Sequence, residues 1–105
     1  MKPFDIFIGY ISWGDEGKTR PVLAYEIDGD IVSVYAITSQ YESKSAAVRV
    51  KFFEINDWKQ AGLDRQSYVD TGKIVDLPFA LISLKSPIGK LSESDRKKFL
   101  EFLSR

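Results

Sequence analysis

The 105-residue chain has room for one small domain, and its hydrophobic fraction of 44% is too high for a disordered segment. It contains neither cysteine nor histidine, which excludes disulfide bonds, thiolate nucleophiles, zinc fingers and every catalytic system that needs a histidine base. Fifteen basic residues balance fifteen acidic ones, so any nucleic-acid contact must come from a local basic site and not from the net charge.

Targeting and cofactor signals are not found either. Met1 and Lys2 lead directly into a patterned strand instead of the apolar centre of a secretory signal. No stretch has the roughly 18 apolar residues of a membrane span, and neither an EF-hand nor a phosphate-binding glycine loop is present. The sequence therefore predicts a cytoplasmic protein with no membrane partner, no metal and no cofactor.

The first half of the chain has the pattern of three strands. Residues 4–11 are β-branched or aromatic and apolar on both faces, which predicts a strand buried between two layers. A polar loop is expected over residues 12–19. The β pattern returns over residues 20–27 and, after the hairpin signal Asp28-Gly29-Asp30, over residues 31–40.

The middle of the chain predicts shorter elements. After a polar loop over residues 41–46, alternating apolar residues over 47–53 predict another strand. Asn56 is expected to cap a short helical turn that stops at Gly62. Residues 67–71 and 73–77 are expected to be two short strands separated by Gly72, and residues 81–85 a further strand or an irregular segment.

The last element is predicted to be a helix. Ser92 followed by Asp95 resembles a capping box at its start. Phe99, Leu100 and Leu103 are expected to form its apolar face, and the residues expected to face solvent are Arg96, Lys97, Lys98 and Glu101. Short strands, a tight hairpin and one terminal helix predict a single α+β domain over residues 1–105. We expect it to be mainly β, a small and partly closed antiparallel barrel with a C-terminal helix.

The hairpin brings a cation and a hydroxyl together. Arg20 and Thr38 each lie nine residues from Gly29, so pairing across the turn places them near one another. Pro21 restricts the backbone of Arg20 at the start of its strand. Taken singly, such an arginine is more often a solvated or ion-paired residue, and Thr38-Ser39 more often part of a turn. Their joint placement favours a functional site.

These motifs together resemble the MazF/PemK family of bacterial toxin endoribonucleases. The family pattern has a first strand that contains aspartate, a loop, a strand that opens with R-P-V-L and a strand that ends in apolar-Thr-small-Gln. The matching residues here are Phe4-Asp5-Ile6-Phe7-Ile8, the loop over residues 13–19, Arg20-Pro21-Val22-Leu23 and Ile37-Thr38-Ser39-Gln40. Further matches, in the same order along nearly the whole chain, are residues 58–63, 67–69 and 88–91.

The resemblance implies an SH3-like barrel, a homodimer and metal-independent cleavage of single-stranded RNA, with an antitoxin protein as partner. The family's catalytic arginine and threonine correspond to Arg20 and Thr38. The sequence departs from the family at two places. Phe4 stands where members usually have glycine before the aspartate, and Val75-Asp76 stands where many have an arginine-threonine pair.

Other residues near the two motifs are candidate RNA contacts. Contacts to flanking nucleotides are expected from Lys18, Ser39, Gln40 and Lys44, each of which could equally be a solvated loop residue. Trp13 and Tyr41 are candidates for stacking on bases, with packing or dimer contacts as the alternative. The expected products are a 2′,3′-cyclic phosphate and a 5′-hydroxyl.

Two other functions fit the same barrel. One is a non-catalytic binding module, such as a gyrase-directed toxin of the CcdB type, because a fold does not fix a function. The balanced charge and the Val75-Asp76 departure favour this reading, and the pairing of Arg20 with Thr38 favours the nuclease. The other is a member of the family that keeps the fold and has lost its activity.

Overall fold

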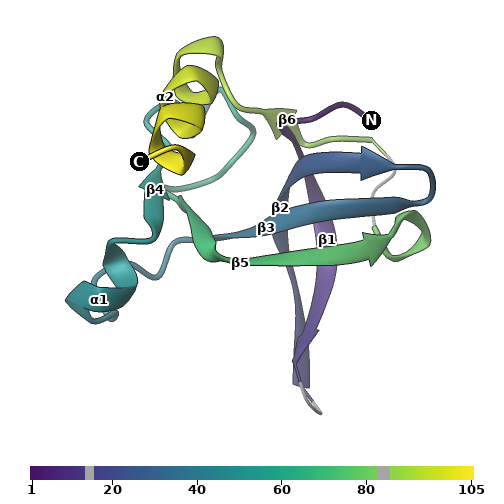
Figure 1. Cartoon of the computed structure of the whole chain (residues 1–105), viewed down its shortest axis with the longest axis horizontal. Helices are drawn as coiled ribbons and strands as arrows, with labels where there is room; N and C mark the ends of the chain where they lie inside the picture. Colours follow the sequence, from purple (N-terminus) through teal and green to yellow (C-terminus); the bar gives the residue numbers. More distant parts are fainter. Residues whose placement is uncertain (14–15, 83–85) are drawn as a thin grey trace.

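A strongly curled antiparallel sheet and a C-terminal helix form this protein, as seen in a computed structural model that describes residues 1–13, 16–82 and 86–105 (Figure 1). The strands are β1 (Asp5–Trp13), β2 (Glu16–Asp28), β3 (Ile31–Thr38), β4 (Phe52–Glu54), β5 (Tyr68–Pro78) and β6 (Gly89–Lys90). The helices are α1 (Ala46–Arg49), the 3-10 helix η1 (Phe79–Leu81) and α2 (Glu93–Leu103).

The sheet is a half-barrel with two edges. Its strand order is β4-β5-β3-β2-β1-β6, and every pair of neighbours is antiparallel. The edge strands β4 and β6 do not pair with each other in the described part of the chain, so the barrel is only partly closed. The predicted fold class, a mainly β, partly closed antiparallel barrel with a C-terminal helix, is confirmed.

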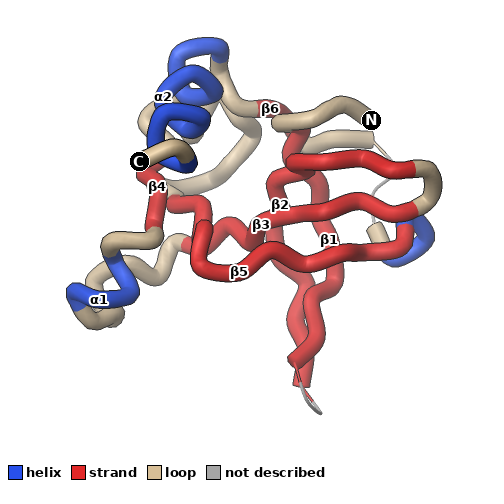
Figure 2. The backbone as a smooth tube through the Cα atoms, viewed as in Figure 1, coloured by secondary structure: helices blue, strands red, loops and turns tan. Residues whose placement is uncertain are grey.

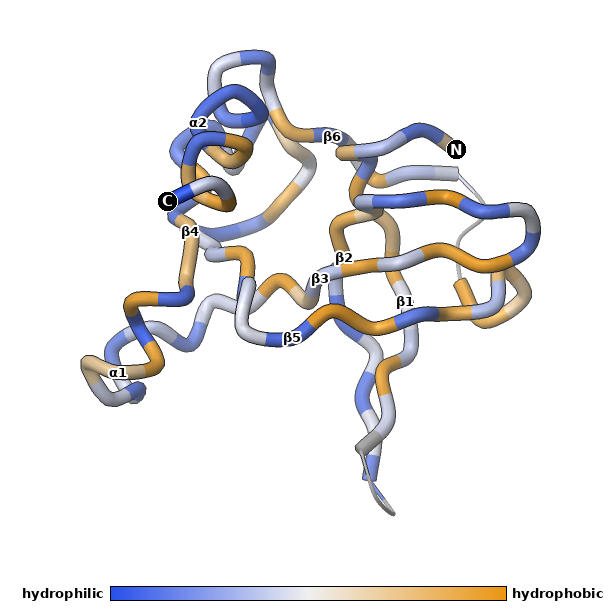
Figure 3. The backbone as a smooth tube through the Cα atoms, in the orientation of Figure 1, coloured by the Kyte–Doolittle hydropathy of each residue, from blue (hydrophilic) through white to orange (hydrophobic). Residues whose placement is uncertain are grey.

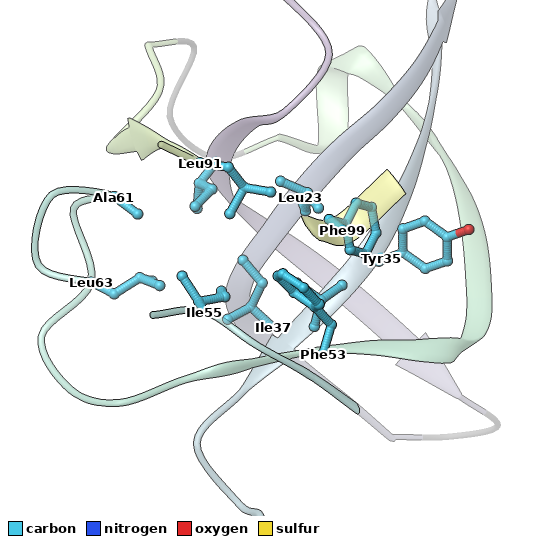
Figure 4. Close-up of a cluster of buried hydrophobic side chains, with 11 residues drawn as sticks. Leu23, Tyr35, Ile37, Phe53, Ile55, Ala61, Leu63, Leu91 and Phe99 are labelled. Carbon is cyan, nitrogen blue, oxygen red and sulfur yellow. The ribbon is translucent and has the colours of Figure 1, made fainter. Parts of the chain in front are cut away.

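Hydrophobic side chains are buried on both faces of the sheet. The helix-side core lies between the sheet and α2 (Figure 4), and the second core lies on the opposite face. Ile6 belongs to the first and its neighbour Phe7 to the second, and both are fully buried. The prediction that the first strand is buried between layers is therefore confirmed. Figure 3 shows the hydrophobic stretches of β3 and β5 that contribute to these cores.

The β2–β3 hairpin turns at Gly29, whose φ of 61° lies in the left-handed region that glycine tolerates. Its register changes once. Ala24 pairs with Val34 and Glu26 pairs with Ser33, so Tyr25 is an extra residue on β2 and forms a β-bulge. The bulge decides which residues of β2 and β3 lie opposite each other beyond it.

The expected loop over residues 12–19 is wrong for residues 12, 13 and 16–19, while residues 14 and 15 lie outside the described residues. β1 and β2 form a two-stranded ribbon there, in which Ser12 pairs with Gly17, and Trp13 with Glu16 (Figures 1 and 2). A hairpin ribbon satisfies backbone hydrogen bonds without burying its side chains, so polar residues are no obstacle to it. Gly17 lets the Tyr10 ring lie over it, because a Cβ there would overlap that ring unless the ring moved.

The expected strand over residues 47–53 is also wrong in its first part. Ser45 begins a helical turn by accepting a hydrogen bond from the amide of Val48 (3.4 Å), and α1 follows. Val48 and Val50, which the alternation placed in the core, are exposed. Only residues 52–54 form a strand, because a local cap competes with the β pattern where no core is available.

The two strands expected around Gly72 form one bent strand, β5. Its pairing with β3 is irregular at the predicted break, since Ile74 opposes Tyr35 while Val69 opposes Ile37. Of the segment 81–85, Leu81 ends η1 and is exposed, Ile82 forms an isolated bridge with Gly9, and residues 83–85 lie outside the described residues.

The turn over residues 56–62 is held from α2. The amides of Asn56 and Asp57 donate to the buried carboxylate of Asp95 at 3.3 and 2.8 Å, so Asp95 supplies the anchor that Asn56 was expected to supply. The turn ends as predicted at Gly62, with φ of 88°. A side chain at that position would overlap the carbonyl of Ile88, so glycine lets the turn pack closely.

α2 begins as predicted, because the Ser92 hydroxyl accepts from the Asp95 amide at 3.1 Å. Its apolar face differs in one residue. Phe99 is fully buried and Leu103 is partly buried, but Leu100 is 46% exposed, and Phe102 packs on the core instead. In the described ranges, no helix is long and apolar enough to cross a membrane.

Phe4 has an unusual backbone conformation, with φ of 73°. A bulky residue rarely adopts a positive φ. The surrounding contacts hold it there. Its amide donates to the carbonyl of Ala24 at 2.7 Å, and its ring lies edge-on to Tyr25 and Phe99. The position therefore suits glycine by its backbone and phenylalanine by its packing.

Candidate functional site

Beyond the bulge at Tyr25, the register of β2 and β3 brings Arg20 level with Thr38, although the pairing itself ends at Val22 and Ala36. Two residues further along each strand are Arg20 and Thr38. Residues two apart on a strand share a face, so both side chains leave the sheet on the same side. Without the bulge Arg20 would oppose Ser39, and Thr38 would point to the other face.

Arg20 and Thr38 line one open cavity of about 360 Å³. Three segments form its wall: the start of the barrel part of β2, the end of β3 with the following loop, and the segment after Gly62. The lining residues are Lys18, Thr19, Arg20, Pro21, Ile37, Thr38, Ser39, Gln40, Lys44, Leu63, Asp64, Arg65 and Ser67. The predicted placement of the cation and the hydroxyl at one end of the sheet is confirmed.

The cavity is basic although the chain as a whole is neutral. Among the described residues its lining has four cations, Lys18, Arg20, Lys44 and Arg65, and one carboxylate, Asp64. Asp64 lies 3.4 Å from the Nε of Arg65, but both side chains are largely exposed, so this ion pair is weak. The lining therefore carries a local positive charge of the kind that attracts a phosphate backbone.

Thr38 and Arg20 are both held in place. The Thr38 hydroxyl accepts a hydrogen bond from the Gln40 amide at 3.0 Å, which fixes its rotamer and leaves its own proton for donation. Arg20 is partly buried, its Nε is shielded from solvent, and Pro21 follows it in the strand. An arginine held by its stem presents its terminal nitrogens in a defined direction.

Four further sequence candidates lie in the cavity wall: Lys18, Ser39, Gln40 and Lys44. The hairpin accounts for the first three, because they adjoin Arg20 and Thr38 in sequence. Sequence reasoning missed Asp64, Arg65 and Ser67, which lie more than twenty residues beyond Thr38. The only local signal was the polar pair Asp64-Arg65 directly after the turn that ends at Gly62.

The two aromatic candidates are not in the cavity wall. Tyr41 stacks on Tyr68 with ring centroids 4.4 Å apart, and the guanidinium of Arg49 lies 4.8 Å from its ring centroid. The Tyr41 ring is thus used in packing, which is the alternative that the sequence left open, and base stacking by Tyr41 stays a prediction. Trp13 lies at the far end of the β1–β2 ribbon, paired with Glu16, and its side chain is outside the described residues.

Beside the cavity, the pKa of Tyr68 is raised. Burial is the main cause, and the nearby carboxylate of Glu54, then Tyr41 and Glu42, act in the same direction, while Arg49 acts against them. Tyr68 is the direct neighbour of Thr38 in the sheet. Its hydroxyl is protonated at neutral pH, as in an ordinary tyrosine.

The acidic residue of the Val75-Asp76 departure lies away from the cavity. Asp76 accepts a hydrogen bond from the Ser33 hydroxyl at 2.6 Å, near the hairpin turn. Ser33 and Thr38 are five residues apart on β3, which is about 17 Å along a strand. A charge at that distance is largely screened at physiological salt, so Asp76 does not offset the cations of the cavity.

No group of three or more acidic residues in the described ranges is arranged to hold a metal ion. Comparison with protein-family models gives no match, and no curated protein matches the sequence.

Proposed function

We propose that this protein is a metal-independent endoribonuclease of the MazF/PemK type that cleaves single-stranded RNA. The observation that carries the proposal is the basic cavity in which Arg20 and Thr38 lie together. A neutral chain that concentrates four cations around one arginine-hydroxyl pair is suited to a phosphodiester substrate.

The backbone at Phe4 supports the resemblance on which this proposal also rests. The family usually has glycine before the first-strand aspartate, and here the residue before Asp5 has a φ of 73°. Glycine adopts that conformation without strain. The departure in sequence is therefore compatible with the same local backbone.

In the proposed reaction the RNA supplies its own nucleophile, the 2′-hydroxyl next to the scissile phosphate. Its oxygen forms a bond to phosphorus while the bond from phosphorus to the 5′-oxygen breaks. Water takes the proton of the 2′-hydroxyl, and the leaving 5′-oxygen takes a proton from water. The products are a 2′,3′-cyclic phosphate and a 5′-hydroxyl end.

Arg20 is the catalytic residue in this proposal. Arginine stays charged at neutral pH and presents a planar fork that matches two phosphate oxygens. Charge accumulates on these oxygens as the nucleophile attacks, so a fixed guanidinium stabilises the transition state more than the ground state. The stem of Arg20, shielded from solvent, reduces the reorganisation that this contact requires.

The remaining cavity residues bind the RNA backbone in this proposal. Lys18, Lys44 and Arg65 contact flanking phosphates, which positions the strand without reading its sequence. Ser39 and Gln40 offer uncharged hydrogen-bonding groups beside them.

Thr38 donates a hydrogen bond from its hydroxyl to the scissile phosphate. Replacing it by valine keeps the shape and removes the donor, and we expect kcat to fall about a hundredfold. The free energy of unfolding should fall by about 1 kcal/mol, because the Gln40 amide loses its acceptor. Single-turnover cleavage and urea unfolding measure the two effects. Thr38→Ser retains the hydroxyl and should stay within a few-fold of wild type, and equal loss in both variants would contradict the role of the hydroxyl.

The direct test is an RNA gel assay with purified protein in excess EDTA. We expect full cleavage of a mixed single-stranded RNA, because Arg20 and not a divalent ion stabilises the transition state. The fragments should carry 5′-hydroxyl ends, which a kinase can label without phosphatase treatment. Intact RNA, or cleavage that stops when EDTA is added, would refute the proposal. Intact RNA together with inhibition of DNA gyrase would instead select the binding-module alternative.

The proposal extends to the family's assembly. We propose a homodimer in the cytoplasm and an antitoxin whose flexible segment covers the basic cavity. An acidic segment is complementary to the four cations of the lining. Loss of RNA cleavage on adding the protein encoded by a neighbouring small gene would identify that partner.

A further inference from the structure

The loop between β3 and α1 is attached to the rest of the molecule through polar contacts and through the ring of Tyr41, which packs on Phe52 and Tyr68. Its residues Glu42, Ser43 and Lys44 are exposed, and α1 has no buried residue. A segment without buried apolar side chains opens locally at low cost in free energy. Gln40 and Lys44, at its two ends, line the cavity, so the conformation of this loop sets the shape of one wall.

Arg49, the last residue of α1, binds this loop with two nitrogens of its guanidinium group. Its Nε donates to the carbonyl of Tyr41 at 3.0 Å, and its Nη2 donates to the carbonyl of Glu42 at 2.6 Å. The same Nη2 lies 3.4 Å from the Glu42 carboxylate, and the guanidinium carbon lies 4.8 Å from the centre of the Tyr41 ring. Two backbone carbonyls and one ring are thus fixed by a single side chain.

The contacts of Arg49 connect it to two residues of the cavity wall, Lys44 and Thr38, through Tyr41. The Tyr41 carbonyl also accepts from the Lys44 amide at 3.1 Å, so Arg49 and Lys44 share one acceptor. On the other side, the Tyr41 ring stacks on Tyr68, which is paired with Thr38 in the sheet. Arg49 itself does not line the cavity. It is placed to act through the loop and not on a ligand.

We infer that Arg49 is a positioning residue that holds the loop over residues 39–44 so that Lys44 and Gln40 face bound RNA. The inference rests on the proposed function for its ligand, a single-stranded RNA backbone. The planar guanidinium of Arg49 is essential to this role, because two of its nitrogens bind two different carbonyls at the same time. A lysine would keep the charge and lose this arrangement.

Equilibrium binding of a 2′-O-methylated RNA oligonucleotide, which cannot be cleaved, tests the inference. We expect Arg49→Ala and Lys44→Ala each to raise Kd about five- to tenfold. The double variant should lose less affinity than the two single variants add up to, because Lys44→Ala already removes one of the contacts that Arg49 positions. Arg49→Lys should bind as poorly as Arg49→Ala. With a cleavable RNA, Arg49→Ala should raise KM and leave kcat within about twofold, since Arg49 does not touch the reacting atoms.

Amide hydrogen exchange separates this inference from the proposed function, because it needs no RNA. The Lys44 amide should exchange at least tenfold faster in Arg49→Ala, while amides of α2 remain unchanged. Lys98→Ala, which removes an exposed cation of α2 outside the cavity, controls for net charge. Additive effects of Arg49→Ala and Lys44→Ala, recovery of affinity in Arg49→Lys, or unchanged exchange at Lys44 would each overturn the inference. If wild type binds and cleaves no RNA, the proposed function fails, and the exchange result alone decides the role of Arg49.

Discussion

Replacing Arg20 by alanine is expected to reduce RNA cleavage about a thousandfold, because one fixed donor to the transition-state charge is worth up to that factor. The loss should be in kcat more than in KM. Lys18, Lys44 and Arg65 still bind flanking phosphates in the variant, and Arg20 acts most strongly on the charge that develops during the reaction. Single-turnover kinetics at saturating RNA measure the effect.

Arg20→Lys is the informative companion. It retains the positive charge and loses the fork, so it should recover only a small part of the lost rate. Lys18→Ala is the matched control, because it removes a cation from the same cavity next to Arg20. That variant should raise KM by a few-fold and have little effect on kcat. If Arg20→Ala and Lys18→Ala lose activity equally and in KM alone, Arg20 is a binding residue and the catalytic assignment is wrong.

The sequence predicted the placement of Arg20 beside Thr38 correctly, although the assumed geometry of the turn was wrong. Equal offsets from Gly29 assumed a turn centred on one residue. The actual turn pairs Asp28 with Ile31, which by itself would place Arg20 opposite Ser39. The bulge at Tyr25 restores the predicted partner. No local motif predicts that bulge, and the Tyr25 ring at the bulge makes tertiary contacts, edge-on to Tyr35 and Phe99 on the helix side.

Local sequence patterns failed where no core was present to enforce them. Val48 and Val50 alternate as in a strand, but the sheet offers them no face, and the cap at Ser45 selects a helix. The polar residues 16–19 resemble a loop, but pairing with β1 keeps them extended. In the first segment a side-chain cap satisfies a backbone amide, and in the second the backbone pairing with β1 does so, so hydrogen bonding of the backbone decides the conformation in both.

The wall of the cavity that follows Gly62 depends on long-range contacts that no local sequence pattern predicts. Asp64, Arg65 and Ser67 reach the cavity because the preceding turn is bound by Asp95, almost forty residues further along the chain. Asp95 takes part in the predicted cap of α2 through its amide, which donates to the Ser92 hydroxyl. Its fully buried carboxylate also accepts two amide hydrogen bonds from the turn. A residue with two plausible local roles cannot be assigned from spacing alone.

The helix-side core gives the second large expected effect. Phe99 is fully buried, and its ring lies edge-on to Phe4, Tyr25, Tyr35 and Phe53, with centroids 5.2 to 6.4 Å apart. Phe99→Ala should lower the free energy of unfolding by about 4 kcal/mol. The substitution removes buried apolar surface and leaves a cavity that the four neighbouring rings cannot close completely. Urea unfolding followed by circular dichroism measures the loss.

Leu100→Ala is the matched control, because Leu100 is the next residue of the same helix and is 46% exposed. Its loss should stay within about 0.5 kcal/mol, as for most surface substitutions. The pair also separates stability from catalysis. Phe99 lies outside the cavity, so the folded fraction of Phe99→Ala should cleave RNA with the wild-type kcat, whereas Arg20→Ala should unfold like wild type and fail to cleave. Equal destabilisation by Phe99→Ala and Leu100→Ala would mean that α2 packs on the sheet through a different face, and that the ring contact of Phe99 with Tyr25 contributes little to stability.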